Sequence, residues 1–244
     1  MLTIGFPADA FGTNCFVLAT GPGEECLVVD PGIGVEDRVA ELLTEHRLRP
    51  AAVLLTHGHL DHVYAVTPVC GGGTGATRVP GASSVPAYIH TDDRYRLHDP
   101  IAMLDGGLLA MLEQQFGRKA TWTEPEEIVE LGNDETLTLA GLTVRVQHAP
   151  GHTEGSVMFT LPDLPDQLGG SSGLVATCLS GDVLFAGSIG RTDLVGGDGA
   201  AMTRSLRDVV LPMPDETLVL PGHGASTTIG RERADNPYLR GLTA

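Results

Sequence analysis

The chain has 244 residues and a formal net charge of −16 at pH 7, a length that one α/β domain can fill. Lys119 is the only lysine among fifteen basic residues, so no basic stripe is available to neutralise phosphates, and we expect no nucleic-acid partner. No apolar run approaches the length of a membrane span and the N-terminus lacks a signal-peptide pattern, so we expect no membrane partner and a cytoplasmic location.

Short β-rich runs recur along the chain, and most of them end at a glycine, proline or aspartate. In chain order they cover residues 2–6, 14–20, 25–30, 51–57, 87–90, 135–150, 156–161, 174–182 and 217–223. Apolar spacing predicts helices within 35–48, 99–117 and 198–211. The scattered cysteines, which lack CxxC spacing, are predicted to be buried thiols of a reducing compartment: Cys15, Cys26, Cys70 and Cys178. This alternation predicts two packed sheets with helices outside, in one domain spanning residues 1–244.

Three segments interrupt the strands. Residues 70–84 and 163–173 have loop composition, and the second is predicted to be a hairpin connection between two apolar strands. Residues 91–130 combine helical and polar sequence, and we expect them to cover one end of the sheets as a cap or lid insertion. Together with 70–84, this cap segment is expected to shape a substrate pocket.

The stretch "THGHLDH" places His57, His59, Asp61 and His62 directly after an apolar strand. Imidazole and carboxylate groups are the usual protein ligands for zinc and related metals. With this composition, H-x-H-x-D-H arises by chance in about one sequence in a thousand. The stretch therefore predicts metal binding and disfavours a chance surface cluster of histidines.

Three further metal-type side chains follow strands and small-residue turns later in the chain. His152 lies in "APGHTEGS", Asp182 in "CLSGDVLFAG" and His223 in "LVLPGHG". Each alone is as well explained by a turn or a hydrogen bond, but the series after the first stretch indicates one shared site. The other four histidines lack this context and are interpreted as surface residues or as residues behind the ligands: His46, His90, His98 and His148. Of these, His148 is the strongest candidate for a role at the site, because it lies four residues before His152.

The ordered motifs "THGHLDH", "PGHT", "SGDVLF" and "PGHG" resemble the metallo-β-lactamase superfamily, and "GSIGRTDL" with "TTIGRERADNPYL" resembles its glyoxalase II-like hydrolases. The resemblance extends from about residue 10 to residue 239 and implies an α/β fold, an αββα sandwich of two mixed sheets with a dinuclear metal site along one edge. It implies that His57, His59 and His152 hold one metal, that Asp61, His62 and His223 hold the other, and that Asp182 bridges them. Two divalent ions are expected, zinc first, with iron or manganese as alternatives.

The resemblance also implies a reaction. A hydroxide shared by two metals attacks the carbonyl of a small-molecule thioester of the S-acylglutathione or hydroxyacyl-thiol type, and Asp61 and Asp182 are the expected catalytic carboxylates. Arg191 occupies the place of a basic residue that contacts the substrate carboxylate, although a structural arginine capping a loop carbonyl explains it equally well. Glyoxalase II continues after its last metal histidine into a helical domain, whereas only twenty-one residues follow His223, so the thiol carrier stays open.

Other activities remain as alternatives. A persulfide dioxygenase with one iron would use His57, His152 and Asp182 as a facial triad, and a lactonase would use the same dinuclear site. The acidic charge disfavours a nuclease, and a metal-binding module without activity is the non-enzymatic alternative. The sequence assigns no oligomeric state.

Overall fold

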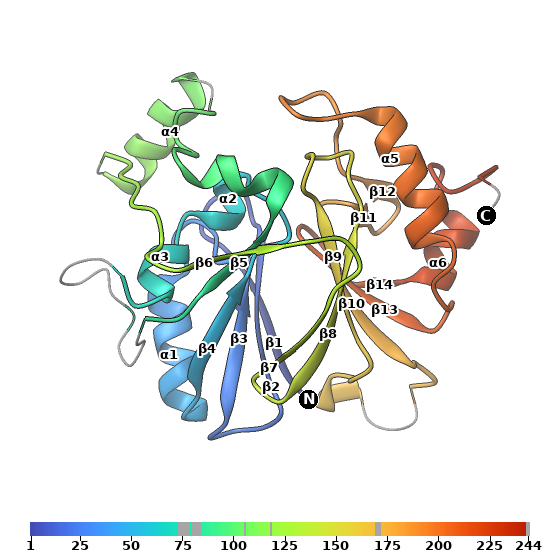
Figure 1. Ribbon diagram of the computed structural model, residues 1–244, viewed down its shortest axis with the longest axis horizontal. Helices are drawn as coiled ribbons and strands as arrows, with labels where there is room; N and C mark the ends of the chain where they lie inside the picture. Colours follow the sequence, from blue (N-terminus) through green and yellow to red (C-terminus); the bar gives the residue numbers. More distant parts are fainter. Residues whose placement is uncertain (73–78, 80–83, 105, 118, 169–171, 243–244) are drawn as a thin grey trace.

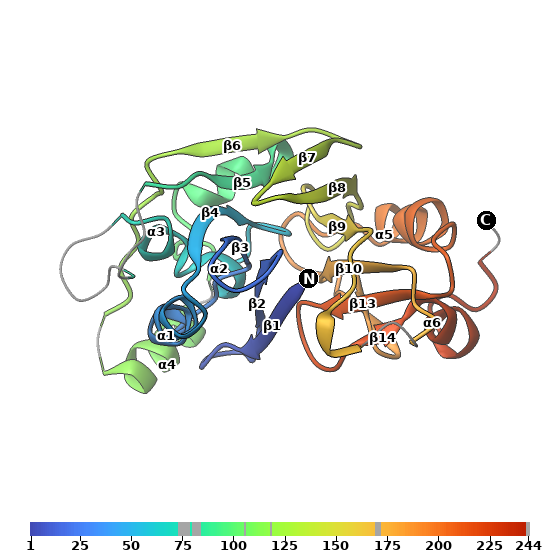
Figure 2. The ribbon, with the colours of Figure 1, turned by 90° about the horizontal axis from the view of Figure 1, so that it is seen from below.

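The computed structural model describes residues 1–72, 79, 84–104, 106–117, 119–168 and 172–242. Two six-stranded β-sheets pack against each other, and helices cover their outer faces (Figure 1; Figure 2). Both sheets contain parallel and antiparallel pairs. The predicted α/β sandwich of two mixed sheets is confirmed.

The first sheet follows the chain order of its strands. It consists of β1 (Leu2–Pro7), β2 (Asn14–Ala19), β3 (Glu25–Val29), β4 (Arg49–Leu54), β5 (Ala87–His90) and β6 (Ile128–Leu131). The strands β1 to β3 form an antiparallel meander, and β3 to β6 are parallel neighbours. Parallel pairing requires crossover connections between these strands, and helices occur in the connections that leave β3, β4 and β5.

The second sheet is formed by strands from the C-terminal half of the chain. Its order is β14 (Thr227–Thr228), β13 (Thr217–Pro221), β10 (Ala176–Gly181), β9 (Val157–Leu161), β8 (Leu142–His148) and β7 (Thr136–Leu139). The run predicted over 135–150 is a hairpin, because Ala140 and Gly141 both have positive φ and form a two-residue turn. A small hairpin, β11 (Leu184–Phe185) and β12 (Ser188–Ile189), follows β10.

Six α-helices, two 3₁₀ helices and one π-helix are present in the described part of the chain. They are α1 (Glu36–His46), α2 (Leu60–Val63), α3 (Val66–Val69), η2 (Thr91–Leu97), α4 (Gly106–Phe116), η3 (Asp166–Leu168), α5 (Gly199–Ser205), η4 (Leu206–Val210) and α6 (Ile229–Asp235). The helix predicted within 35–48 is confirmed and ends where Arg47 takes a left-handed conformation. The helix predicted within 99–117 begins only at Gly106, and residues 100–104 before it form turns and bends. None of these helices combines the length and apolar character needed to cross a membrane.

Alternation along β2 separates two of the hydrophobic clusters of the protein. In β2, Phe16 and Leu18 pack between the sheets, whereas Cys15 and Val17 point toward α1 and α3. Successive side chains of a strand face opposite sides, so a sheet buried on both faces needs the continuous apolar run seen here. All four cysteines are free and buried, as predicted.

The ends of several strands meet at one edge of the sandwich. The segment after β4 carries the first histidines, and the β8–β9 loop, the end of β10 and the end of β13 approach it from the second sheet. The hairpin predicted at 163–173 connects the antiparallel strands β9 and β10, and residues 169–171 of it lie outside the described residues. Most of the loop predicted at 70–84 also lies outside them.

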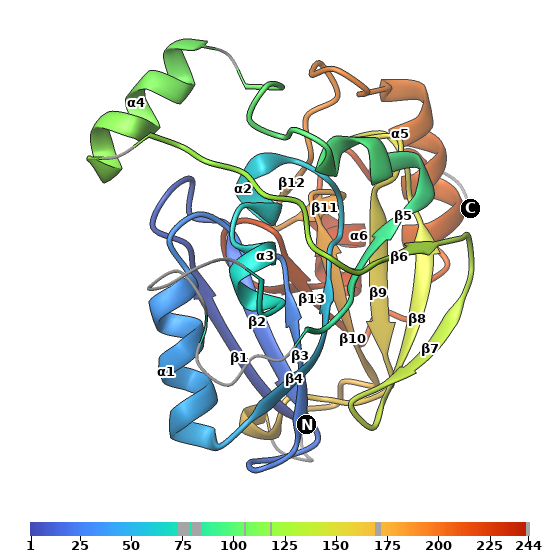
Figure 3. The ribbon, with the colours of Figure 1, turned by 60° about the vertical axis from the view of Figure 1, so that its left-hand side comes forward.

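The segment 91–130 contains η2 and α4, and its last residues form β6 of the first sheet. Helix α4 stands above α2 on the outer side of that sheet (Figure 3). Only Leu112 of α4 is buried, so this helix contacts the body of the protein through a narrow apolar stripe.

Candidate metal centre

Three histidines direct ring nitrogens at one position. His57 and His59 follow β4, and His152 lies in the β8–β9 loop. The Nδ1 atom of His59 is 3.2 Å from Nε2 of His57 and 2.9 Å from Nε2 of His152. His57 and His152 are buried, whereas His59 is half-buried. The first predicted ligand group is therefore brought together by two segments almost a hundred residues apart.

A second group forms beside it from Asp61, His62 and His223. The Nε2 atoms of His62 and His223 are 3.2 Å apart, and Oδ2 of Asp61 is 3.2 Å from Nε2 of His223. The same Asp61 oxygen is 3.5 Å from Nε2 of His62. His223 reaches this position from the end of β13, so both sheets contribute to each group.

Asp182 lies between the two groups. Its Oδ2 atom is 3.5 Å from Nε2 of His152 and 3.5 Å from Nε2 of His223, while Oδ1 is 3.4 Å from Nε2 of His62. Oδ1 is fully buried and accepts no hydrogen bond from the described residues. A buried carboxylate oxygen without a hydrogen bond is costly, and a cation shared by the two groups would satisfy it. Gly222 makes room here, because a Cβ atom at this position would overlap Oδ1.

The spacing of these atoms fits metal coordination. Tetrahedral bonds of about 2.0 to 2.2 Å place neighbouring ligand atoms about 3.3 to 3.6 Å apart. The separations from 2.9 to 3.5 Å within the groups lie close to this range. The seven residues predicted as ligands therefore form two adjoining pockets of the size that divalent ions require.

The residues behind the histidines fix which nitrogen faces the centre. Asp30 accepts hydrogen bonds from Nδ1 of His62 at 3.0 Å and from the Thr56 hydroxyl at 2.7 Å. Because Thr56 gives its proton to Asp30, Nδ1 of His57 must donate to the Thr56 oxygen at 3.1 Å. Nδ1 of His152 donates to the carbonyl oxygen of Arg191 at 2.8 Å. In all three histidines Nε2 is thus the nitrogen that faces the centre, the orientation that binds metal.

The electrostatics of the centre favour neutral imidazoles on one side and positive charge on the other. Burial, followed by the neighbouring imidazoles, lowers the pKa of His57, and burial lowers the pKa of His59 to about 3. Burial also acts to lower the pKa of His62, but the carboxylates of Asp182, Asp61 and Asp30 outweigh it and raise this pKa well above its usual value. A position surrounded by three carboxylates stabilises a cation.

Asp93, in η2, holds both ligand loops and was not predicted from the sequence. Its side chain is fully buried and accepts hydrogen bonds from the amides of Gly58 at 2.7 Å and Gly155 at 2.8 Å. It also accepts from the Thr153 hydroxyl at 2.8 Å and from Nε of Arg96 at 3.2 Å. The loop containing His57 and His59 and the loop containing His152 are therefore tied to one carboxylate.

A cavity of about 580 Å³ opens above the centre. His59, Asp61, His152, Asp182 and His223 form its polar floor. Its walls are largely apolar and come from the β1–β2 loop, α2, the segment 91–130 and the loop after β12: Phe11, Leu60, Pro100, Met103, Leu104, Leu108, Leu194 and Val195. A volume between about 300 and 1,000 Å³ is typical of small-molecule sites, so the metal ligands face a space fit for a small substrate.

Two arginines line the same cavity, and both are paired. Arg191 donates from Nε and Nη2 to the two carboxylate oxygens of Asp193, each at 2.7 Å. Arg96 donates to Asp93, to Glu154 at 2.6 Å and to the carbonyl of Val195 at 2.9 Å. Arg191 thus lies at the site, as predicted, with part of its hydrogen-bonding capacity already used by a carboxylate, and its role toward substrate stays a prediction.

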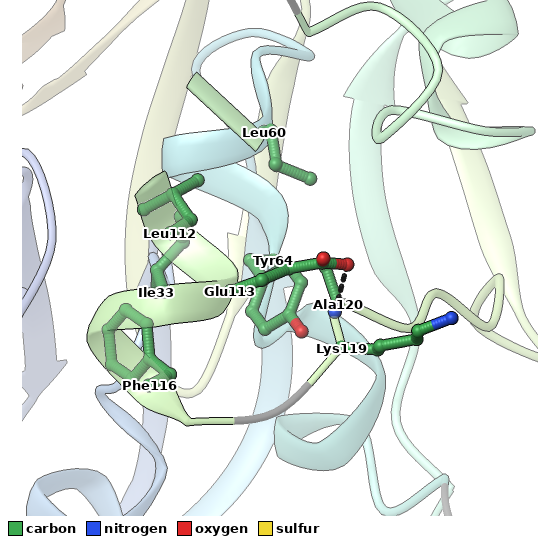
Figure 4. A pocket seen from close by; sticks show the side chains of 8 residues that line it. All are labelled: Ile33, Leu60, Tyr64, Leu112, Glu113, Phe116, Lys119 and Ala120. Carbon is green, nitrogen blue, oxygen red and sulfur yellow. Dashed lines mark hydrogen bonds between the residues drawn. The ribbon is translucent and has the colours of Figure 1, made fainter. Parts of the chain in front are cut away.

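A smaller pocket lies between α4 and the ligand helix, α2, which carries Asp61 and His62 (Figure 4). Leu112 and Phe116 of α4 meet Leu60 and Tyr64, which flank Asp61 and His62 in the sequence. The carboxylate of Glu113 accepts a hydrogen bond from the amide of Ala120 at 3.2 Å. Through this pocket, α4 contacts the segment that carries two of the ligands.

The remaining histidines lie outside the metal centre. His90 and His148 stack with ring centroids 4.0 Å apart and approach Asp92. Both nitrogens of His90 are used, since Nδ1 accepts from the Asp92 amide and Nε2 contacts Asn133 Oδ1. His148 donates to the Glu154 carbonyl. This pair therefore joins η2 to the β8–β9 loop and has a structural explanation.

Comparison with known proteins places this geometry in context. The model of the metallo-beta-lactamase superfamily matches residues 8–223. An uncharacterised protein of Mycobacterium tuberculosis is 43% identical over 244 residues, the full length of both chains. YqgX of Bacillus subtilis, a probable metallo-hydrolase, is 32% identical and aligns over 97% of each chain. The hydroxyacylglutathione hydrolase GloC of Haemophilus influenzae is 29% identical, over 96% of this chain and 95% of its own.

Solved structures agree with the sequence relatives. The BLEG-1 B3 metallo-beta-lactamase superimposes with a TM-score of 0.74 at 36% identity, covering 98% of this chain and 100% of its own. TTHA1623, crystallised in a di-iron-bound form, superimposes with a TM-score of 0.70 at 31% identity, covering 97% of this chain and 100% of its own. Similarity therefore extends over nearly the whole chain and includes every ligand segment.

Proposed function

Because the chain belongs to the metallo-β-lactamase superfamily, we propose that it is a metal-dependent hydrolase that cleaves a thioester of the hydroxyacyl-thiol type. The observation that carries this proposal is the pair of ligand groups joined by Asp182 at the floor of the cavity. The 29% identity with the hydroxyacylglutathione hydrolase GloC supports the thioester as the bond that is cleaved.

Two divalent ions, when bound, would lower the pKa of a water molecule and polarise the substrate carbonyl. His57, His59 and His152 would hold one ion, Asp61, His62 and His223 the other, and Asp182 would contact both. In the overall reaction, the oxygen of water bonds to the acyl carbon, the C–S bond breaks, and the thiol leaves with a proton. No oxidant or other reactant is required.

The chain's own residues hold this arrangement and keep rival nucleophiles away. Asp30 and the Arg191 carbonyl orient His62 and His152, and a fixed orientation of ligands lowers the cost of reaching the transition state. The Ser180 hydroxyl donates to the Leu184 carbonyl at 2.7 Å, and Ser156 bonds to Thr153. With the cysteines buried as well, water is the nucleophile that this site favours.

The completeness of the second ligand group favours two metals over one. A single-iron persulfide dioxygenase would need only His57, His152 and Asp182, and would give no role to the group of Asp61, His62 and His223. The di-iron form of TTHA1623 supports two metals in a relative of this chain. Zinc is our first candidate, with iron and manganese as alternatives, because imidazole and carboxylate ligands accept all three.

The similarity to BLEG-1 favours a second candidate reaction, hydrolysis of a β-lactam amide. This reaction would use the same water and the same polarised carbonyl, with a nitrogen leaving group in place of sulfur. The two reactions are separated by assaying a chromogenic cephalosporin beside the thioester.

The test is hydrolysis of S-lactoylglutathione by metal-free protein reconstituted separately with zinc, manganese and iron(II), followed by free-thiol release. A kcat/KM of about 10⁴ M⁻¹s⁻¹ or more with one of the metals is expected, together with two ions per chain by elemental analysis. Equal rates with and without metal would refute the proposal. Oxygen consumption with glutathione persulfide, and no thioester hydrolysis, would point to the dioxygenase instead.

A further inference from the structure

The cavity above the metal centre has an unusual mouth. Several large apolar side chains that line it are left exposed: Phe11 at 42%, Met103 at 44%, Leu194 at 41% and Val195 at 82%. Isolated exposed apolar residues are common on protein surfaces, but a contiguous group that surrounds a cavity marks a binding site. These four residues come from three separate segments of the chain and converge on one opening.

The apolar wall continues inward from this mouth. Leu60, Leu104 and Leu108 also line the cavity, and the first two belong to the apolar cluster formed by α2 and α4. The wall is thus part of a packed layer between the ligand helix and the cap segment, held by buried neighbours. The position of Leu60 in this wall is also fixed by the metal centre, because Leu60 lies in the sequence between the metal-type residues His59 and Asp61.

The charges at the mouth do not offer a strong site for an anion. The two arginines of the wall are paired with Asp193 and with Asp93 and Glu154. Three carboxylates therefore accompany two guanidinium groups, on a chain of formal net charge −16. A polyanionic group at this mouth would meet cations that are already paired with carboxylates, whereas an apolar group would meet a matching surface.

We propose that the apolar wall binds the acyl group of the substrate, and that this acyl group carries an apolar chain beyond its hydroxyacyl end. The proposal rests on the proposed thioester hydrolysis, since it names the class of acyl group that this site accepts. The carbonyl carbon would lie over the ligand floor, and the chain would extend along Met103, Leu194 and Val195 toward solvent. Removing apolar surface from water is the driving force.

Chain length gives a quantitative expectation. Burial of one methylene group favours binding by about threefold to fourfold. From butanoyl to octanoyl, four added methylene groups are expected to raise kcat/KM by about 80- to 250-fold. The thiol portion should show no such dependence.

The experiment measures kcat/KM of the zinc-loaded protein for N-acetylcysteamine thioesters of acetate, butanoate, hexanoate and octanoate. S-lactoyl-octanethiol, in which the long chain is on the thiol, is assayed in parallel. Binding of butanoate, hexanoate and octanoate to the same protein is measured by titration calorimetry, because these carboxylates are the reaction products and report on the wall without turnover.

Matched variants test the position of the wall. Met103→Gln keeps the length of the side chain and is expected to lower the octanoyl-to-acetyl ratio of kcat/KM by about tenfold. Met111→Gln is its control, because Met111 is 51% exposed on α4 and does not line the cavity. Val195→Asn has an equivalent control in Val175→Asn, at a residue 52% exposed outside the cavity.

The outcomes separate this proposal from the proposed function. A flat or falling dependence on acyl length, with the acetyl thioester hydrolysed, overturns the acyl wall and leaves thioester hydrolysis standing. A length dependence that follows the thiol chain also overturns it. If the zinc-loaded protein cleaves no thioester, the proposed thioester hydrolysis is wrong, and the alkanoate titration alone tests the apolar wall. Alkanoate binding that tightens with chain length and is weakened by Met103→Gln supports binding of an apolar chain at the wall. Equal binding of all three alkanoates overturns it.

Discussion

Replacing Asp93 by alanine is expected to destabilise the protein and loosen both ligand loops. This carboxylate accepts four hydrogen bonds in a fully buried position, from Gly58, Gly155, Thr153 and Arg96. Removing one partner of a buried ion pair costs about 3 to 5 kcal/mol. Here the amides of Gly58 and Gly155 would stay buried without an acceptor, while Arg96 would keep its bonds to Glu154 and to the Val195 carbonyl. For a protein of this size, each kcal/mol lowers the Tm by about 2 to 4 °C.

The expected fall in Tm for Asp93→Ala is therefore about 6 to 20 °C. Asp93→Asn keeps the shape but replaces an acceptor by an NH₂ donor facing other donors, so we expect at least half of that fall. Metal affinity should drop by about 10- to 100-fold, the usual result of losing support behind ligands. The Tm is measured by scanning calorimetry on zinc-loaded protein, and metal affinity by competition with a chelator.

Asp92→Asn is the matched control. The carboxylate of Asp92 lies next to Asp93 in the sequence, but it is 52% exposed and accepts no hydrogen bond from the ligand loops. It should leave metal affinity unchanged and shift the Tm by no more than about 2 °C. If Asp93→Asn gave the Tm and metal affinity of Asp92→Asn, the proposed role of Asp93 in holding the two loops would be wrong.

Three further results are expected. Asp182→Asn should bind at most one metal tightly and lose most of its activity, and two bound ions with normal turnover would contradict the bridging role. Chelation of the metals should lower the Tm measurably, because bound ligand stabilises the folded state in proportion to the logarithm of its concentration over Kd; an unchanged Tm would count against metal binding. Burial raises the pKa of Cys26, Cys70 and Cys178 to about 12, so the reactive thiolate form is scarce at pH 8. Ellman's reagent should therefore label these thiols only after denaturation. Rapid labelling of the folded protein would contradict their burial.

The metal centre could be predicted from the sequence because its chemistry restricts the residue types. Few kinds of side chain bind such a metal, and the imidazole and carboxylate groups used here each follow a strand that is itself visible as an apolar run. His152, Asp182 and His223 are therefore recognisable one by one, and the structure brings them together with His57 and His59. Asp30 followed the same pattern, at the end of "LVVD", and the strand end was the signal that could have identified it.

Asp93 gave no such signal. It lies in a polar stretch, "TDDRYR", beside an exposed aspartate of the same type, and only the fold shows which of the two carboxylates is buried. Its partners are the amides of Gly58 and Gly155, which are 35 and 62 residues away. Backbone donors carry no sequence identity, so a residue that satisfies them cannot be recognised by matching side-chain types.

The cavity wall was even less accessible to sequence reasoning, for a physical reason that also bears on its function. Metal ligands need a particular atom at a particular place, whereas an apolar wall needs only surface of sufficient size, which Leu, Met, Val or Phe supplies equally well. Phe11, Leu108 and Val195 belong to no common periodic pattern and reach the cavity from separate loops and a helix. Loops around a fixed centre can therefore change the substrate without disturbing the chemistry. Under the proposed function, these loops, more than the ligands, would decide which acyl group enters.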